Sequence, residues 1–188
     1  ASDLELLVGA DAVRAAVTDL MVLDRTTPPS TSQSIAARNF DLILTTNYDT
    51  LLERADRSTA LTVIDTDTPE QLPANALVKL HGSLDNLSWL VLTDKDLRDH
   101  AHRRRHLLRT LITEMRHRPV IVVGATLRDP STVALFDSCK PNSSGWLIGP
   151  AFNMVERMRA ANWNLQPVVG TAEKFFVALQ EALDGYPT

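Results

Sequence analysis

The stretch that decides the fold is FDLILTTNYD, which occupies residues 40–49. Residues 41–45 form an almost continuous apolar run, which is typical of a parallel strand that is buried on both faces. The residues that follow are polar and include Thr46, Asn47 and Asp49. In an open α/β sheet, ligands bind just beyond the carboxyl ends of the strands. The stretch therefore predicts a buried strand that ends at a binding site.

Two further segments repeat this arrangement of an apolar run followed by small or polar residues. His81, Gly82 and Ser83 follow the apolar run at 76–80, and the sequence GATLRDP at 124–130 follows a second run. If all three strands are parallel, a carboxamide, a carboxylate, an imidazole and a Gly-Ala-Thr turn meet at one crevice. Such a set suits a nucleotide and a reaction at its sugar.

Strand and helix patterns alternate along the rest of the chain, which predicts an α/β fold with a parallel, doubly wound sheet. The expected strands lie at 41–45, 61–64, 77–81, 89–92, 120–124, 145–148 and 166–169. The expected helices lie at 3–23, 34–38, 50–56, 93–97, 103–117, 130–136, 153–161 and 172–183. We therefore expect a Rossmann-like, three-layer α/β/α domain over residues 1–188, with a mostly parallel sheet. Residues 1–35 add a helix and a Thr/Pro/Ser-rich loop.

Composition restricts the classes of partner. The net charge of −4 argues against direct nucleic-acid binding. The longest apolar runs fall well short of the roughly 18 residues that a membrane span needs. The chain opens without a charged-then-apolar leader, so the cytoplasm is the expected compartment. The single cysteine, Cys139, excludes an internal disulfide and a Cys-rich zinc module, and we expect it to be a small core or surface thiol.

The polar residues after the first and second motif strands have two interpretations each. The Asn47 amide can hold a sugar hydroxyl or a water, and the Asp49 carboxylate can accept from a carboxamide NH₂. Alternatively, Asn47 turns the chain and Asp49 caps a helix. His81 has the side chain of a general base near neutral pH. Alternatively, it is a satisfied histidine near the core.

Other polar features favour structural interpretations. Gly124 begins a turn whose backbone N–H groups can face a phosphate or ribose, or which is simply a tight strand-to-helix turn, and the chain contains no G-x-G-x-x-G fingerprint. The histidines and arginines between residues 100 and 117 are expected on a solvated helix face, and Asp65 and Asp67 in a loop. Trp146 and Trp163 are expected to serve packing.

Taken together and in this order, three phrases resemble the sirtuin-like superfamily. They are ILTTNYDTLLE at 43–53, VKLHGSL at 78–84 and VGATLRDP at 123–130. The closer resemblance is to the divergent, zinc-free sirtuin-like NAD-hydrolase domains of bacterial defence proteins, and it spans roughly residues 36 to 136.

The resemblance implies binding of NAD and cleavage of its nicotinamide–ribose bond. Asn47 would sit by the nicotinamide ribose and position the attacking water, Asp49 would hold the carboxamide, and His81 would take a proton from a ribose hydroxyl. These three are the expected catalytic residues. The remaining expected NAD-binding residues are Thr46, Gly124, Thr126, Leu127, Gly170 and Thr171.

The chain departs from the family in two places. The four-cysteine zinc module of protein-deacylating sirtuins cannot form, so we expect no zinc or other metal, with water as the acceptor. The Gly-rich loop that cradles the NAD pyrophosphate has no counterpart before Asp41; Leu7-Val8-Gly9-Ala10 comes nearest but lies in a helical pattern. We therefore expect the domain to lack that strand and loop, because the chain is a fragment, because residues are missing, or because NAD binding has been lost.

The function implied by the resemblance is an NAD⁺ glycohydrolase that acts in antiphage defence by depleting NAD. Its expected partners are NAD⁺ and either further copies of the chain or a sensing module. The alternatives are a catalytically silent sirtuin-like module for NAD or ADP-ribose sensing, oligomerisation or partner docking, and a different Rossmann-like nucleotide binder.

Overall fold

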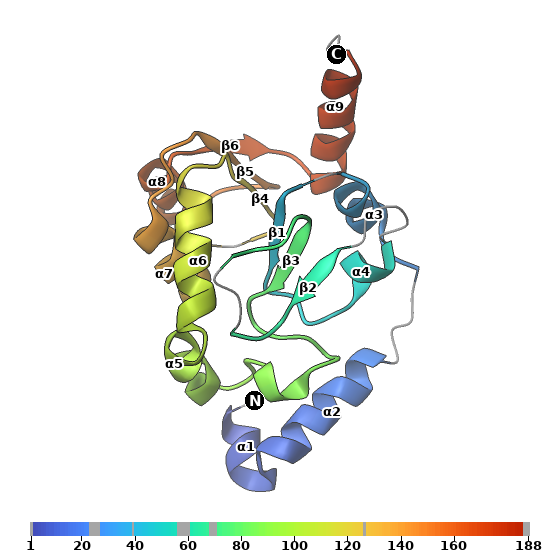
Figure 1. The fold of residues 1–188 in the computed structure, drawn as a ribbon, viewed down its shortest axis with the longest axis vertical. Helices are drawn as coiled ribbons and strands as arrows, with labels where there is room; N and C mark the ends of the chain where they lie inside the picture. The colour runs from blue at the N-terminus through green and yellow to red at the C-terminus, as the bar shows by residue number, and fades with distance from the viewer. Residues whose placement is uncertain are drawn as a thin grey trace. The chain divides into compact units, whose positions relative to one another are not determined.

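The fold of the chain is seen in a computed structural model that describes residues 2–22, 27–38, 40–55, 61–67, 71–125 and 127–185. Within these ranges, six strands form two three-stranded sheets (Figure 1). Every strand pair in both sheets is parallel, and helices connect the strands. This confirms the predicted Rossmann-like α/β class. The chain divides into two compact units, Ala1–Leu107 and Leu108–Thr188.

Unit 1 is built on the sheet order β1-β3-β2, with β3 in the centre. Its strands are β1 (Leu42–Thr45), β2 (Thr62–Ile64) and β3 (Ala76–Lys79). Its helices are α1 (Ser2–Val8), α2 (Ala10–Val22), α3 (Ser30–Ala36), α4 (Leu51–Ala55), the 3₁₀ helix η1 (Leu87–Trp89) and α5 (Asp94–Arg103). All four residues of β3 are buried, as the apolar run predicts.

The segment at 89–92 is not a strand, although its apolar residues predicted one. Residues 87–89 form η1, and the chain after it is extended without pairing to a sheet. The carbonyl groups of Leu87 and Leu90 accept hydrogen bonds from Nη1 of Arg14, at 3.0 and 2.9 Å. Because a side chain occupies these acceptors, they do not join a strand ladder. The apolar side chains of Leu90 and Val91 are nevertheless buried.

Two helices stand where one was expected at residues 3–23. Gly9 separates α1 from α2 with a φ of +87°, a conformation that favours glycine. Arg14 attaches α2 to the start of α5, because its Nη2 atom lies 2.9 Å from Oδ1 of Asp96. The hydrogen bonds between Thr93 and Asp96 form the capping box that their spacing indicated.

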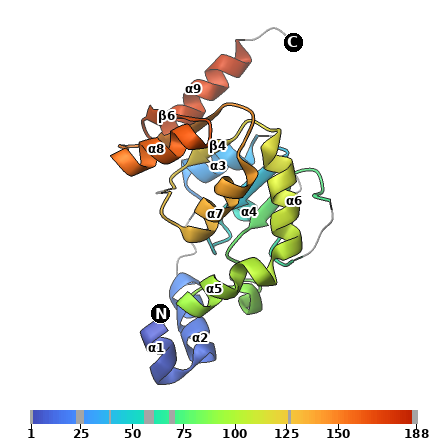
Figure 2. The ribbon, with the colours of Figure 1, turned by 90° about the vertical axis from the view of Figure 1, so that its left-hand side faces the viewer.

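Unit 2 contains the second sheet, in the order β4-β5-β6. Its elements are β4 (Ile121–Val123), α7 (Pro130–Cys139), β5 (Gly145–Gly149), α8 (Met154–Asn162), β6 (Leu165–Val169) and α9 (Ala172–Asp184), and α6 (Arg105–Arg116) crosses the boundary between the units. Helix α8 packs against β6, and α9 leaves the end of that strand (Figure 2).

The core of unit 2 contains Trp163, for which the sequence predicted a packing role, and Cys139, which it predicted to be a small core or surface thiol. Trp163 is buried and stacks on Phe136, with ring centroids 4.8 Å apart, and its Nε1 donates to Asp137. Cys139 is also fully buried, and that burial raises the pKa of its thiol. The expected packing role of Trp163 and the core interpretation of Cys139 are confirmed. Trp146, on β5, is 38% exposed.

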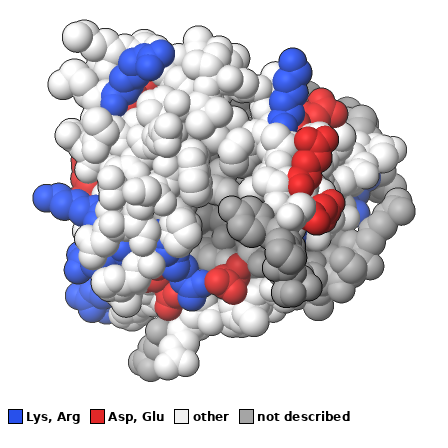
Figure 3. Space-filling model, turned by 90° about the horizontal axis from the view of Figure 1, so that it is seen from above, with Lys and Arg blue, Asp and Glu red and all other residues white. Residues whose placement is uncertain are grey.

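The surface carries charges of both signs. Lys and Arg side chains and Asp and Glu side chains both occur on the face seen in Figure 3, in keeping with the small net charge of −4. None of the helices in the described ranges has the length and hydropathy to cross a bilayer.

Candidate functional site

The ends of β1 and β3 bring the first two motifs together in unit 1. Thr45 is in register with Lys79, and the amide of Leu80 donates to the Thr45 carbonyl at 2.8 Å. Beyond the strands, the amide of Leu84 donates to the carbonyl of Tyr48 at 3.1 Å. The loop after β1 and the loop after β3 are therefore hydrogen-bonded neighbours (Figure 1).

His81 lies at this junction and is 8% exposed. Its ring meets the ring of His100 edge to face, and its carbonyl accepts from the Val91 amide at 3.0 Å. The next residue, Gly82, has a φ of +87°, and a Cβ there would lie 2.5 Å from the carbonyl oxygen of Trp89. Only glycine allows the segment around η1 to approach His81 this closely.

The loop after β1 holds the other expected catalytic residues. Asn47 is exposed, and its backbone N–H donates to Oγ1 of Thr45 at 3.1 Å. The Asp49 carboxylate accepts from the Leu51 amide at 3.0 Å, so it caps the start of α4. The structural interpretation of Asp49 is thus confirmed, and the same contact fixes its carboxylate at the end of β1. Thr46 lies between them and is half-buried.

A fully buried lysine, which the sequence analysis did not single out, lies beneath this loop. The Nζ atom of Lys79 is 2.7 Å from Oε1 of Glu53 and 3.3 Å from the Tyr48 carbonyl, and it also donates to the Asp49 carbonyl. The signal was available, since Lys79 interrupts an otherwise apolar strand, and a lysine is almost never fully buried unless it is paired.

His100 of α5 and Arg104, the residue at the C-terminal cap of α5, both bind carbonyls at the end of β3, which corrects the expectation of a solvated helix face. His100 is 4% exposed, and its Nε2 lies 2.9 Å from the Leu80 carbonyl. Because a carbonyl only accepts, Nε2 must carry the proton. Arg104 is 1% exposed and donates to the Lys79 and Asp65 carbonyls. Burial lowers the pKa of Arg104 to about 10, against the opposing effect of the nearby Asp65 carboxylate.

The expectation of a solvated face does hold for other members of that segment. His102, Arg105, His106 and His117 are exposed. The Asp67 carboxylate accepts from the amides of His106 and Leu107, so this loop residue also starts α6. Among the described residues, His, Cys, Asp and Glu side chains do not gather into a group of three or more that could hold a metal.

In unit 2, the expected NAD-binding residues differ in whether their backbone or side-chain groups are accessible to a ligand. Gly124 follows β4 with a φ of +68° and open space around its Cα, so its backbone is accessible. The Leu127 side chain is buried at 1% exposure. The Gly170 amide donates to the Gly149 carbonyl, and Thr171 caps α9 as predicted. Thr126 lies outside the described residues.

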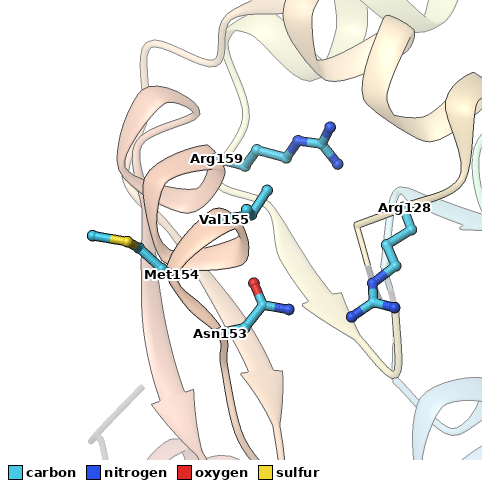
Figure 4. A pocket seen from close by; sticks show the side chains of 5 residues that line it. All are labelled: Arg128, Asn153, Met154, Val155 and Arg159. Carbon is cyan, nitrogen blue, oxygen red and sulfur yellow. The ribbon is translucent and has the colours of Figure 1, made fainter.

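A pocket of about 490 Å³ in unit 2 lies next to this turn. Its lining residues are Arg128, Asn153, Met154, Val155 and Arg159 (Figure 4). In Figure 4, Arg159 extends from α8 toward the side on which Arg128 lies, and the Asn153 amide lies below Arg159 in this view. Asn153 Oδ1 accepts from the Glu156 amide at 2.9 Å and caps α8. Guanidinium groups suit phosphate oxygens, so the chemistry of the pocket favours an anionic ligand.

Sequence reasoning missed these pocket residues. The motif at 124–130 contains Arg128, whose side chain had no predicted role. Asn153 follows β5 in the same way that Asn47 follows β1, and that position after a strand was the available signal.

A comparison of the sequence with models of protein families gives a match. The model of a family described as "SIR2-like domain" matches residues 41–168, which is more than half of the chain. The matched range contains Asn47, His81 and the pocket residues. No curated protein matches the sequence.

Proposed function

The chain belongs to the SIR2-like family, and from this membership we propose that it is an NAD⁺ hydrolase domain that cleaves the bond between nicotinamide and ribose. In this reaction, water adds to C1′ of the ribose as its bond to nicotinamide breaks. The products are nicotinamide, ADP-ribose and a proton. Positive charge develops on the sugar as the bond breaks, as it does in glycoside hydrolysis. Catalysis then depends on positioning the water and stabilising that charge.

The observation that carries the proposal is that β1 and β3 are paired neighbours, with Thr45 in register with Lys79, so that Asn47 and His81 each lie two residues beyond that last pair. The hydrogen bond between the Leu80 amide and the Thr45 carbonyl joins the two loops at their base. In the proposed reaction, the exposed Asn47 amide positions the water, and His81 accepts a proton from a ribose hydroxyl. Asp49 accepts from the nicotinamide carboxamide, and Thr46 contacts NAD beside it.

Unit 2, taken by itself, carries groups that suit the phosphates of a nucleotide. The two arginines of the pocket match the charge of a pyrophosphate. We assign them to the ADP portion of NAD, together with the residues that the family resemblance indicated, which are Gly124, Thr126, Leu127, Gly170 and Thr171. Zinc has no place in this proposal.

The proposed biological output is NAD depletion in antiphage defence. That output requires access to the cytoplasmic NAD pool, so the proposal includes a cytoplasmic location. It also requires that the activity be held in check until infection. We therefore propose control by oligomerisation of the chain or by an associated sensing domain or protein.

A second candidate is a catalytically silent SIR2-like module that senses NAD or ADP-ribose, oligomerises or docks a partner. Exposed apolar side chains favour it. Leu6 and Leu7 on α1 are 86% and 82% exposed, and Met154 and Met158 on α8 are 78% and 61% exposed. Such side chains are typical of protein interaction sites when they are contiguous.

The experiment that separates the candidates measures, by chromatography, the release of nicotinamide from NAD⁺. It compares the wild-type protein with the His81→Ala variant. Release that disappears in His81→Ala, with ADP-ribose as the second product, supports the hydrolase. Binding of NAD⁺ or ADP-ribose without release supports the sensing module. If the protein neither binds NAD⁺ or ADP-ribose nor releases nicotinamide, the result supports the docking module. A chelator is expected to change neither the folding nor the activity.

A further inference from the structure

We propose that Lys79 is a positioning residue, whose ammonium group fixes the Asn47–Asp49 loop beside His81. The inference rests on the proposed function of this site. It concerns a buried charged side chain that the proposed reaction itself does not use.

The contacts of Lys79 join three consecutive parts of the chain after β1. Its Nζ donates to the carbonyls of Tyr48 and Asp49 and to the carboxylate of Glu53 on α4. An ammonium group has three N–H donors, and these contacts use all three. The two carbonyls belong to the loop that carries Asn47, so Nζ sets the path of its backbone.

The backbone of Lys79 is held as firmly as its side chain. Its carbonyl accepts from Nη1 of Arg104 at 2.8 Å, and the next carbonyl, that of Leu80, accepts from His100. His81 follows directly in the sequence. Lys79 therefore links a fixed strand end, which carries His81, to the loop that carries Asn47.

Burial makes a purely stabilising role a weak explanation. Lys79 is 0% exposed, and the Glu53 side chain is 20% exposed. Desolvating two charges offsets most of their attraction, so apolar residues of similar size often stabilise a protein equally well. What an apolar pair cannot reproduce is the pair of hydrogen bonds to the Tyr48 and Asp49 carbonyls. The effect of Lys79 should therefore appear in the position of the loop.

The test uses the double variant Lys79→Met with Glu53→Leu, which removes both charges and avoids a lone buried carboxylate. Lys95→Met, on the exposed side of α5, is the matched control. We expect the double variant to keep the wild-type melting temperature within a few degrees. Its kcat for nicotinamide release should fall about 100-fold, with little change in KM, because a small displacement of catalytic groups costs that much.

Amide hydrogen exchange measures how firmly the loop after β1 is held, and it does so independently of catalysis. The Leu84 amide bonds to the Tyr48 carbonyl, and the Leu51 amide bonds to Asp49. In the double variant both amides should exchange faster, whereas the Leu80 amide, which donates to the Thr45 carbonyl at the end of β1, should keep its rate. A wild-type kcat in a folded double variant overturns the proposal, as does unchanged exchange at both amides.

These readouts keep the two proposals apart. If the wild-type protein releases no nicotinamide, the proposed function fails, and exchange alone decides the inference about the loop. Faster exchange at Leu51 and Leu84 then supports the anchoring by Lys79, and unchanged exchange overturns it.

Discussion

The imidazole rings of His81 and His100 meet edge to face, with centroids 5.6 Å apart and ring planes at 87°. His100 is itself fixed by the hydrogen bond of its Nε2 to the Leu80 carbonyl, at 2.9 Å. The fixed ring of His100, on α5, therefore packs against one side of the His81 ring. This arrangement limits the rotamers of His81, which in the proposed reaction would orient the ring for proton transfer.

Replacing His81 by alanine should remove the proposed proton acceptor. We expect nicotinamide release to fall by about 100- to 10,000-fold, the usual contribution of a general base. The measurement is the initial rate at saturating NAD⁺. His102→Ala, which changes an exposed histidine on α5, is the control and should retain the wild-type rate. A wild-type rate in His81→Ala would contradict the assignment.

Asn47→Ala should separate catalysis from stability. Because Asn47 is exposed, its replacement should change the free energy of unfolding by no more than about 0.5 kcal/mol. The kcat should nevertheless fall about 100-fold, since the water loses the amide that positions it. Asn162→Ala, at an exposed position on α8, provides the comparison. Equal kcat values for the two variants would remove Asn47 from the site.

Arg128→Ala should weaken binding of the substrate more than turnover. The loss of one charge-assisted hydrogen bond of about 1.5–3 kcal/mol corresponds to a rise in the dissociation constant of at least about 10-fold. Calorimetry with ADP-ribose measures this without turnover. Arg109→Ala, at an exposed arginine on α6, should bind normally. Unchanged affinity in Arg128→Ala would argue against a phosphate role for the pocket.

Gly82→Ala should destabilise unit 1 through a clash as well as through backbone strain. Gly9 has the same φ of +87°, but a Cβ there meets no atom within 4 Å. Gly9→Ala should therefore cost only the left-handed backbone, about 1–2 kcal/mol. Gly82→Ala adds the approach to the Trp89 carbonyl and should cost about 1–3 kcal/mol more. Urea unfolding compares them, and equal losses would rule out the close approach.

The carboxylate of Asp96 should stabilise the attachment of α2 only above acidic pH. Burial raises the pKa of Asp96, but hydrogen bonding from the Leu92 amide, the charge of Arg14 and bonds from Thr93 outweigh it, so the net pKa lies below 3.8. A carboxyl with a lowered folded-state pKa stabilises the fold above its unfolded-state pKa. That contribution disappears as the pH falls through the folded-state value.

The corresponding experiment measures unfolding of Asp96→Asn and of the wild type between pH 2.5 and pH 6, in steps of about half a unit. The difference in free energy of unfolding should be constant above about pH 5 and should shrink below about pH 4. Asp99→Asn, at an exposed position on α5, is the control. A difference that does not vary with pH would show that the charge of Asp96 does not matter.

The sequence predicted the parts of this molecule that depend on neighbouring residues. The apolar run before Asn47 became the parallel strand β1, in which Ile43 is buried and the other three residues are half-buried, and the spacing of Thr93 and Asp96 became a capping box. Of the two interpretations of Asp49, helix capping is confirmed, and binding of a carboxamide stays a prediction. In these cases the deciding contacts lie within a few residues.

The failures concern contacts made across the fold. Arg104 and His100 resemble surface residues in a run of charges, yet they are buried because carbonyls of β3 accept their hydrogen bonds. The expected strand at 89–92 is also absent, and the Leu90 carbonyl there accepts a hydrogen bond from Arg14, which lies 76 positions away in the sequence. No periodicity in the sequence reports which distant donor meets which carbonyl.

The attachment of Arg14 has a practical consequence for any shortened form of this protein. A fragment that starts at Thr27 would keep both strands that carry Asn47 and His81. It would also leave the Leu87 and Leu90 carbonyls and the Asp96 carboxylate without the guanidinium group of Arg14, and it would lose the buried side chain of Val13, which is 2% exposed. Since the Val91 amide bonds to the His81 carbonyl, loosening that segment would reach the candidate site. A fragment whose ends are chosen from the sheet alone would therefore have an impaired candidate site. Any expressed fragment should include α2.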